Sequence, residues 1–207
     1  MAFNLTVGKE KFIKNCYEKS MKELNKFFRI NWKKDTPKIV LMADRKAIDK
    51  HRGAKTEDWV VGYVKNNKVF VLSPENYEKE SCHKFSEKEY YGLIKHELVH
   101  LFEFAITKSN NSPNWLREGL AFYLAGQLEN KKKPKHLNSF LRYYKKFGEG
   151  IYTESGFAVK FLIENYGKNR LFKLFRLIKT IKSEKQFYKK FKDVYGFELS
   201  YKNINNS

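Results

Sequence analysis

The chain has 207 residues, of which 42% are apolar and 16% aromatic, enough to form a buried core and too many for a disordered protein. Its 42 Lys and Arg against 23 Asp and Glu give a net charge of +19, which excludes an acidic, solvating segment. The excess is mostly Lys and is spread along the chain, which favours a solvated surface over a dedicated nucleic-acid surface. The charged N-terminus lacks the apolar run of a signal peptide, and no apolar stretch reaches membrane-spanning length, so we expect a cytoplasmic protein without membrane contact.

The N-terminal part predicts helices and a small sheet. Apolar residues at three- and four-residue steps predict an amphipathic helix over 9–30, followed by a short buried strand over 38–42. Asp44 is a typical helix N-cap, and Gly53 a typical end for the helix that follows it. The apolar runs 59–64 and 68–72 flank Asn66-Asn67, which indicates a tight hairpin.

The next predicted helix, over about 86–106, carries the sequence His96-Glu97-Leu98-Val99-His100, and Ser86 with Glu89 forms a capping-box pattern at its start. Residues four apart lie one helical turn from each other, so the two imidazoles can reach the same metal ion. With about 100° per residue, both histidines fall away from the apolar stripe and Glu97 lies beside them. Glu97 can then reach a metal-bound water without being a ligand.

A third ligand is required, because hydrolytic zinc sites take three protein ligands and keep a fourth position for water. Glu118 follows His100 by 18 residues, on a helix that we expect to run to about Leu128. Ser112 and Pro113 are typical of a helix N-cap and first turn. Gly119 suggests a close approach between this helix and the histidine helix.

The C-terminal part predicts helices over about 136–147, 153–166, 169–181 and 184–194. Their apolar residues include aromatic side chains that we interpret as core, and we find no repeat or phosphate-binding loop. The two cysteines, Cys16 and Cys82, are too far apart for a metal-binding pair motif and are interpreted as ordinary thiols.

His-Glu-x-x-His followed by Trp115-Leu116-Arg117-Glu118-Gly119 resembles the gluzincin metallopeptidases, and most closely the peptidase MA-like domains related to the catalytic domain of the aminopeptidase family. The segment from Tyr152 to Ala158 resembles the tyrosine-bearing helix of that group. The motif with which aminopeptidases grip a free amine is missing, so their specificity is not expected here.

The resemblance implies an α+β, zincin-like fold, in which a small mixed sheet with an open edge strand packs on the metal-binding helix and a mostly helical subdomain follows. We expect one catalytic unit made of an α/β subdomain over 1–107 and a helical subdomain over 108–207. By the same resemblance, Lys68–Leu72 is the candidate edge strand along which an extended peptide would pair, and a plain structural edge is the alternative.

The implied activity is zinc-dependent peptide-bond hydrolysis on a peptide or protein substrate. One Zn²⁺ per chain would be held by His96, His100 and Glu118. Glu97 would be the general base, and Tyr152 the hydrogen-bond donor to the oxyanion by family resemblance.

Several alternatives stay open. Tyr143, Tyr144 and His136 are reserve candidates for the oxyanion donor. Glu103 lies on the histidine face of the helix. It either orients a ligand imidazole or is an exposed carboxylate, and the exposed carboxylate is the favoured interpretation. The competing functions are a non-catalytic or highly selective zincin-fold binding protein and a basic nucleic-acid-associated protein. Substrate identity and oligomeric state do not follow from the sequence.

Overall fold

A computed structural model of the chain describes residues 7–32, 34–148 and 151–206. The chain forms two compact units, Met1–Phe102 and Glu103–Ser207. The division falls inside helix α3 (Glu87–Thr107), so the last turns of this helix belong to the second unit. Helices together with a small mixed sheet confirm the predicted α+β class. Among the described helices, none has the length and apolar character needed to cross a membrane.

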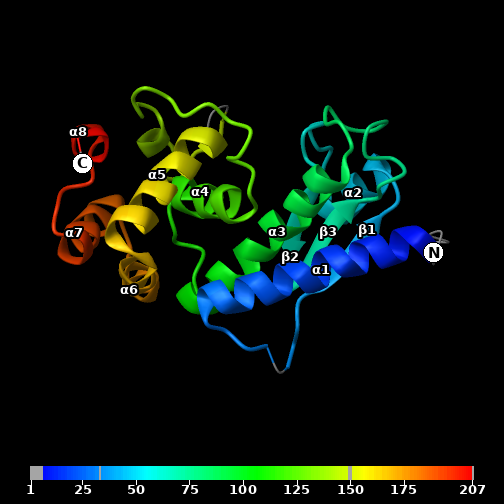
Figure 1. Cartoon of the computed structure of the whole chain (residues 1–207), viewed down its shortest axis with the longest axis horizontal. Coiled ribbons are helices and arrows are strands. Elements are labelled where there is room, and N and C mark those ends of the chain that lie inside the picture. Colours follow the sequence, from blue (N-terminus) through cyan, green and yellow to red (C-terminus); the bar gives the residue numbers. More distant parts are fainter. Residues whose placement is uncertain (1–6, 33, 149–150, 207) are drawn as a thin grey trace. The chain divides into compact units, whose positions relative to one another are not determined.

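In the first unit two long helices pack on each other (Figure 1). Besides α3, this unit contains α1 (Val7–Phe28), β1 (Lys38–Met42), α2 (Arg45–Arg52), β2 (Gly62–Lys65) and β3 (Lys68–Leu72). The buried ring of Phe28 near the end of α1 stacks on Phe102 of α3, with ring centroids 5.3 Å apart. Farther along, the Tyr91 hydroxyl donates to Glu23 at 3.0 Å. The amphipathic pattern of α1 therefore covers the helix that carries the histidines.

The sheet is mixed and has the strand order β1-β3-β2. Asn66 and Asn67 adopt φ of 50° and 55°, the left-handed backbone that a tight two-residue hairpin needs and that Asn tolerates. This confirms the predicted hairpin between β2 and β3, although β2 begins at Gly62 and not at Trp59.

The prediction that Lys68–Leu72 is the edge strand was wrong, because β3 lies in the centre of the sheet. β1 pairs with it in parallel from Lys38↔Lys68 to Met42↔Leu72, and β2 pairs antiparallel on its other side. Val69, Val71 and Leu72 are fully buried, as a central strand requires. The antiparallel edge strand is β2.

Local end signals behave as the sequence indicates in this unit. The Asp44 side chain accepts a hydrogen bond from the Ala47 amide at 2.7 Å at the start of α2, and Gly53 closes that helix with φ of 77°. Ser86 caps α3 by accepting the Glu89 amide at 3.1 Å. The start of the histidine helix is thus fixed by local chemistry.

The second unit is helical. It contains α4 (Asn114–Leu124), the 3₁₀ helix η1 (Phe140–Tyr143), α5 (Ile151–Tyr166), α6 (Lys168–Ile178), α7 (Glu184–Tyr195) and α8 (Tyr201–Asn205). Its fully buried side chains include Trp115, Phe140, Phe187 and Phe191, which confirms the interpretation of the C-terminal aromatics as core.

The predicted helix over 136–147 was wrong, because this stretch forms only the short η1. One carboxylate oxygen of Glu154 accepts the backbone amides of Asn138, Ser139 and Phe140 at 3.0, 2.7 and 3.1 Å. Three amides converging on one carboxylate fix the conformation of this segment just before and at the start of η1. The tertiary contact with α5 therefore overrides the local helical pattern.

The two central helices of this unit, α4 and α5, approach each other at Gly119. A Cβ atom at this position would lie 2.4 Å from the backbone oxygen of Ser155 and 2.9 Å from a methyl group of Val159. The sequence indicated a close approach at Gly119 and assigned it to the histidine helix, whereas the atoms nearest to this glycine belong to α5. The neighbouring helix is α5, and this contact sets the position of the first turns of α4.

Candidate metal centre

The two histidines lie one turn apart on α3, as the motif predicts. Their ring centroids are 5.0 Å apart and the rings are inclined at 81°. Each histidine is only 8% exposed. Two imidazoles held this way by one helix could both reach one metal ion, because the helix fixes their spacing.

Glu97 is also 8% exposed and lies against the edge of the sheet. A Cβ atom added at Gly62, the first residue of β2, would lie 3.0 Å from the Oε1 atom of Glu97 and 2.9 Å from Leu93. Only glycine lets the strand come this close without moving the glutamate. Sequence reasoning missed Gly62, although a glycine at the end of the apolar run 59–61 was a possible signal.

Glu118 lies on α4 and is 6% exposed. The helix begins at Asn114, and the N-cap position is Pro113, which has no side-chain cap. The prediction that Ser112 caps this helix was wrong, because its hydroxyl donates to the Glu103 carboxylate. The helix also ends at Leu124, earlier than the expected Leu128, and continues as turns.

His96, His100 and Glu118 form a group in which each residue offers one ligand atom and these atoms lie within 4.8 Å of one another. All three side chains are buried. Ligands in a tetrahedral shell about 2.1 Å from an ion are separated by about 3.4 Å, so modest side-chain rotation would close this group on a metal ion. The arrangement could hold a metal.

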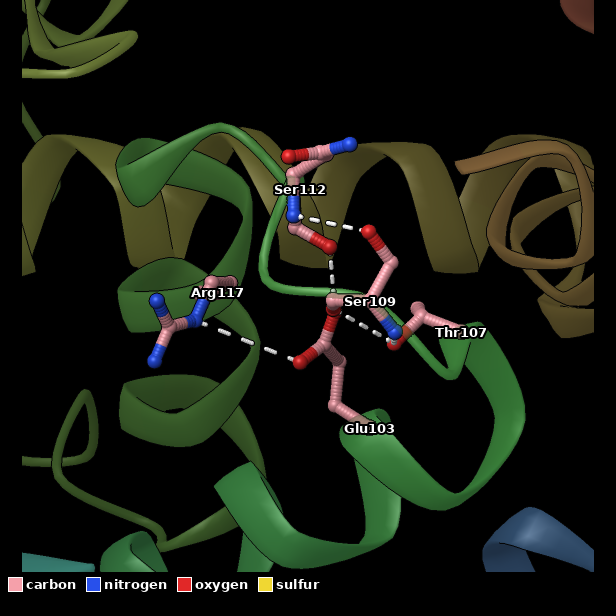
Figure 2. Close-up of polar contacts among 6 residues, drawn as sticks. Glu103, Thr107, Ser109, Ser112 and Arg117 are labelled. Atoms are coloured by element: carbon pink, nitrogen blue, oxygen red, sulfur yellow. Dashed lines mark hydrogen bonds and ion pairs between the residues drawn. The ribbon is translucent and has the colours of Figure 1, made fainter. Parts of the chain in front are cut away.

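Glu103 lies one turn beyond His100 on α3 and is 3% exposed, so the favoured interpretation as an exposed carboxylate was wrong. Figure 2 shows its carboxylate between Ser112 and Arg117. The Ser112 hydroxyl donates to Oε1, and the Nε atom of Arg117 lies 4.0 Å from Oε2, within ion-pair distance but beyond a hydrogen bond. Sequence reasoning missed Arg117.

Tyr152 lies in the first turn of α5 and is partly exposed, with its ring centroid 5.9 Å from that of Phe122 on α4. Glu154, two residues after Tyr152 on α5, accepts the backbone amides of Asn138, Ser139 and Phe140. These bonds connect the beginning of α5 to the segment before η1. The role of Tyr152 as the oxyanion donor stays a prediction.

The reserve donors occupy different environments. His136 is exposed, and Tyr143 is partly exposed in η1. Tyr144 is buried against Phe187, with ring centroids 5.6 Å apart. Burial, and to a smaller extent the negative charge of the nearby Glu184, raises the pKa of the Tyr144 hydroxyl to about 12. These contacts assign Tyr144 to the core.

Comparisons with models of known protein families, with curated proteins and with solved structures found no match to this chain.

Proposed function

We propose that the chain is a zinc-dependent peptidase that hydrolyses peptide bonds with Glu97 as general base. The observation that carries the proposal is the buried group of His96, His100 and Glu118, whose ligand atoms lie within 4.8 Å of one another. Two imidazoles and one carboxylate are a donor set that catalytic zinc takes, with a fourth position left for water. The resemblance to the gluzincins supports the same assignment.

A bound zinc ion would supply Lewis-acid chemistry, lowering the pKa of a bound water toward about 7 and polarising the scissile carbonyl. Glu97 would take the proton from the attacking water and return it to the leaving amine. Glu97 directly follows His96 on α3, and its Oε1 atom lies so close to Gly62 that an added Cβ there would be 3.0 Å away. A positioned acid–base group of this kind contributes about 10²- to 10⁴-fold in rate.

The substrate would pair as an extended chain with β2, which is the antiparallel edge strand. This replaces the prediction that the substrate pairs with β3. Gly62 brings the beginning of β2 next to Glu97, so a peptide on this strand would pass the general base. Main-chain pairing gives affinity with little demand on sequence. Tyr152 would donate a hydrogen bond to the oxyanion.

The test measures bound metal and cleavage of an unfolded protein by the wild-type chain, Glu97→Gln and Glu118→Ala. We expect one zinc per purified chain in the wild type and in Glu97→Gln. Glu118→Ala should retain no zinc through purification, because the two imidazoles alone bind it only weakly. Cleavage should fall by at least about 10²-fold in Glu97→Gln, because that variant keeps the metal but lacks the base. Zinc binding without any cleavage would favour a non-catalytic binding protein, and absence of zinc would overturn the proposal.

A further inference from the structure

The second unit contains a buried polar cluster that the proposed chemistry does not use, the Glu103–Ser112–Arg117 cluster. Glu103 is 3% and Ser112 1% exposed, and the Arg117 side chain is 23% exposed. The cluster joins the last turns of α3 to the start of α4 (Figure 2). It therefore bridges the two ends of the loop that separates the histidine helix from the Glu118 helix.

The loop is held by short-range hydrogen bonds from the end of α3 onward. The Thr107 hydroxyl donates to the Ser109 carbonyl at 3.0 Å, and the Ser109 hydroxyl accepts the Asn111 amide at 3.1 Å. Ser112 then turns its hydroxyl away from the N-cap position and toward Glu103. Ser112 lies one residue before the N-cap position of α4, which is Pro113, and its hydroxyl forms a bond between the two helices.

The chemistry of the cluster explains why it fixes a geometry. A carboxylate removed from water needs a hydrogen-bond donor and a nearby positive charge, and Ser112 and Arg117 offer one each. Ser112 and Arg117 can both reach the Glu103 carboxylate only while the start of α4 stays close to Glu103. Because Glu103 lies one turn after His100 and Arg117 directly precedes Glu118, the cluster links the second histidine to the third ligand through neighbouring residues.

We propose that the Glu103–Ser112–Arg117 cluster is a positioning device that sets Glu118 in register with the histidines for metal binding. This inference rests on the proposed metal site but not on peptide hydrolysis. Glu103, Ser112 and Arg117 are positioning residues in this scheme, since they act on the metal through Glu118. Groups that hydrogen-bond directly to metal ligands commonly change metal affinity by about 10- to 100-fold, and this cluster acts through the backbone of α4, so the lower end of that range applies.

The test measures the zinc dissociation constant of the full chain by chelator competition, in Glu103→Gln and in Ser112→Ala. We expect affinity to fall by about 10-fold in Glu103→Gln and in the same direction in Ser112→Ala. The matched control is Ser73→Ala, because Ser73 is 3% exposed and donates to the Ala43 carbonyl at 3.1 Å, outside the cluster. It should unfold at a lower temperature yet bind zinc as the wild type does.

A double-mutant cycle separates positioning from general stability. In a Glu118→Ala background the cluster has no ligand to position, so adding Glu103→Gln should change the remaining zinc affinity by less than about 2-fold. A further loss as large as in the wild-type background would overturn the proposal, as would unchanged affinity in both Glu103→Gln and Ser112→Ala. Wild-type chain that binds no zinc would also overturn it. Cluster-dependent zinc affinity without any proteolysis would remove the peptidase proposal alone.

Discussion

A glycine-to-alanine series tests the packing that holds the Glu118 helix. Gly8 has no atom within 4 Å of an added Cβ, Gly156 would meet the side chain of Leu128 at 3.0 Å, and Gly119 would meet the Ser155 backbone oxygen at 2.4 Å. All three lie in helices, so each substitution gains up to about 1 kcal/mol of helix propensity. The difference between them is the cost of the new contact.

The magnitude follows from what must move. Ordinary contact begins at 3.4 Å, so a methyl group at Gly119 forces α4 and α5 apart by about 1 Å against backbone atoms. Overpacking of this kind costs about 1 to 3 kcal/mol and can cost more, and each kcal/mol shifts Tm by about 2 to 4 °C in a chain of this size. A clash with backbone atoms takes the upper end of this range, and about 3 kcal/mol less about 1 kcal/mol of helix propensity leaves about 2 kcal/mol. We therefore expect Gly119→Ala to lose about 4 to 8 °C and Gly8→Ala to gain at most about 2 to 4 °C, with Gly156→Ala between them because Leu128 can rotate.

The assay is thermal unfolding of the metal-free chain followed by circular dichroism, with urea unfolding as a check on the free energy. Zinc binding should weaken in Gly119→Ala, because the displaced helix carries the neighbouring Glu118. A Tm for Gly119→Ala within 1 °C of the wild type would refute the reasoning, since it would mean that α4 and α5 do not approach at this glycine.

Three further outcomes are expected. Glu154→Gln should lower the free energy of unfolding, measured in urea, by about 2 kcal/mol, because three backbone amides lose their anionic acceptor. The control Glu164→Gln breaks only an exposed ion pair with Lys160 and should change this free energy by less than about 0.5 kcal/mol. Because burial raises the Tyr144 pKa from 10.0 to about 12, its contribution is present below pH 10 and is lost as the pH rises to 12; Tyr144→Phe should make stability fall less steeply across this range, and an unchanged slope would contradict the assignment. Zinc at about 100 times its Kd should stabilise the wild type by about 2.7 kcal/mol but leave Glu118→Ala unshifted in thermal unfolding.

The sequence alone determined the features that depend on neighbouring residues. Asp44 marks the start of α2 through its side chain and Gly53 marks the end through its backbone freedom, and both effects act within one turn. Asn66-Asn67 forms the hairpin because asparagine tolerates positive φ. The spacing of His96 and His100 likewise follows from the helical repeat. These local rules placed both imidazoles on one face of α3 without reference to the rest of the chain.

Only the tertiary structure decided the features that depend on distant partners. β3 became the central strand because β1 pairs with it in parallel, and no local pattern records which strand pairs with which. α4 begins one residue later than a Ser112 cap would place it, with Pro113 at the N-cap, and the Ser112 hydroxyl donates to the buried Glu103 carboxylate. Gly119 signals a close approach, but its neighbour, α5, lies more than thirty residues away in the chain. Local propensity acts over a single turn, whereas burial and long-range pairing depend on which surfaces meet when the chain folds.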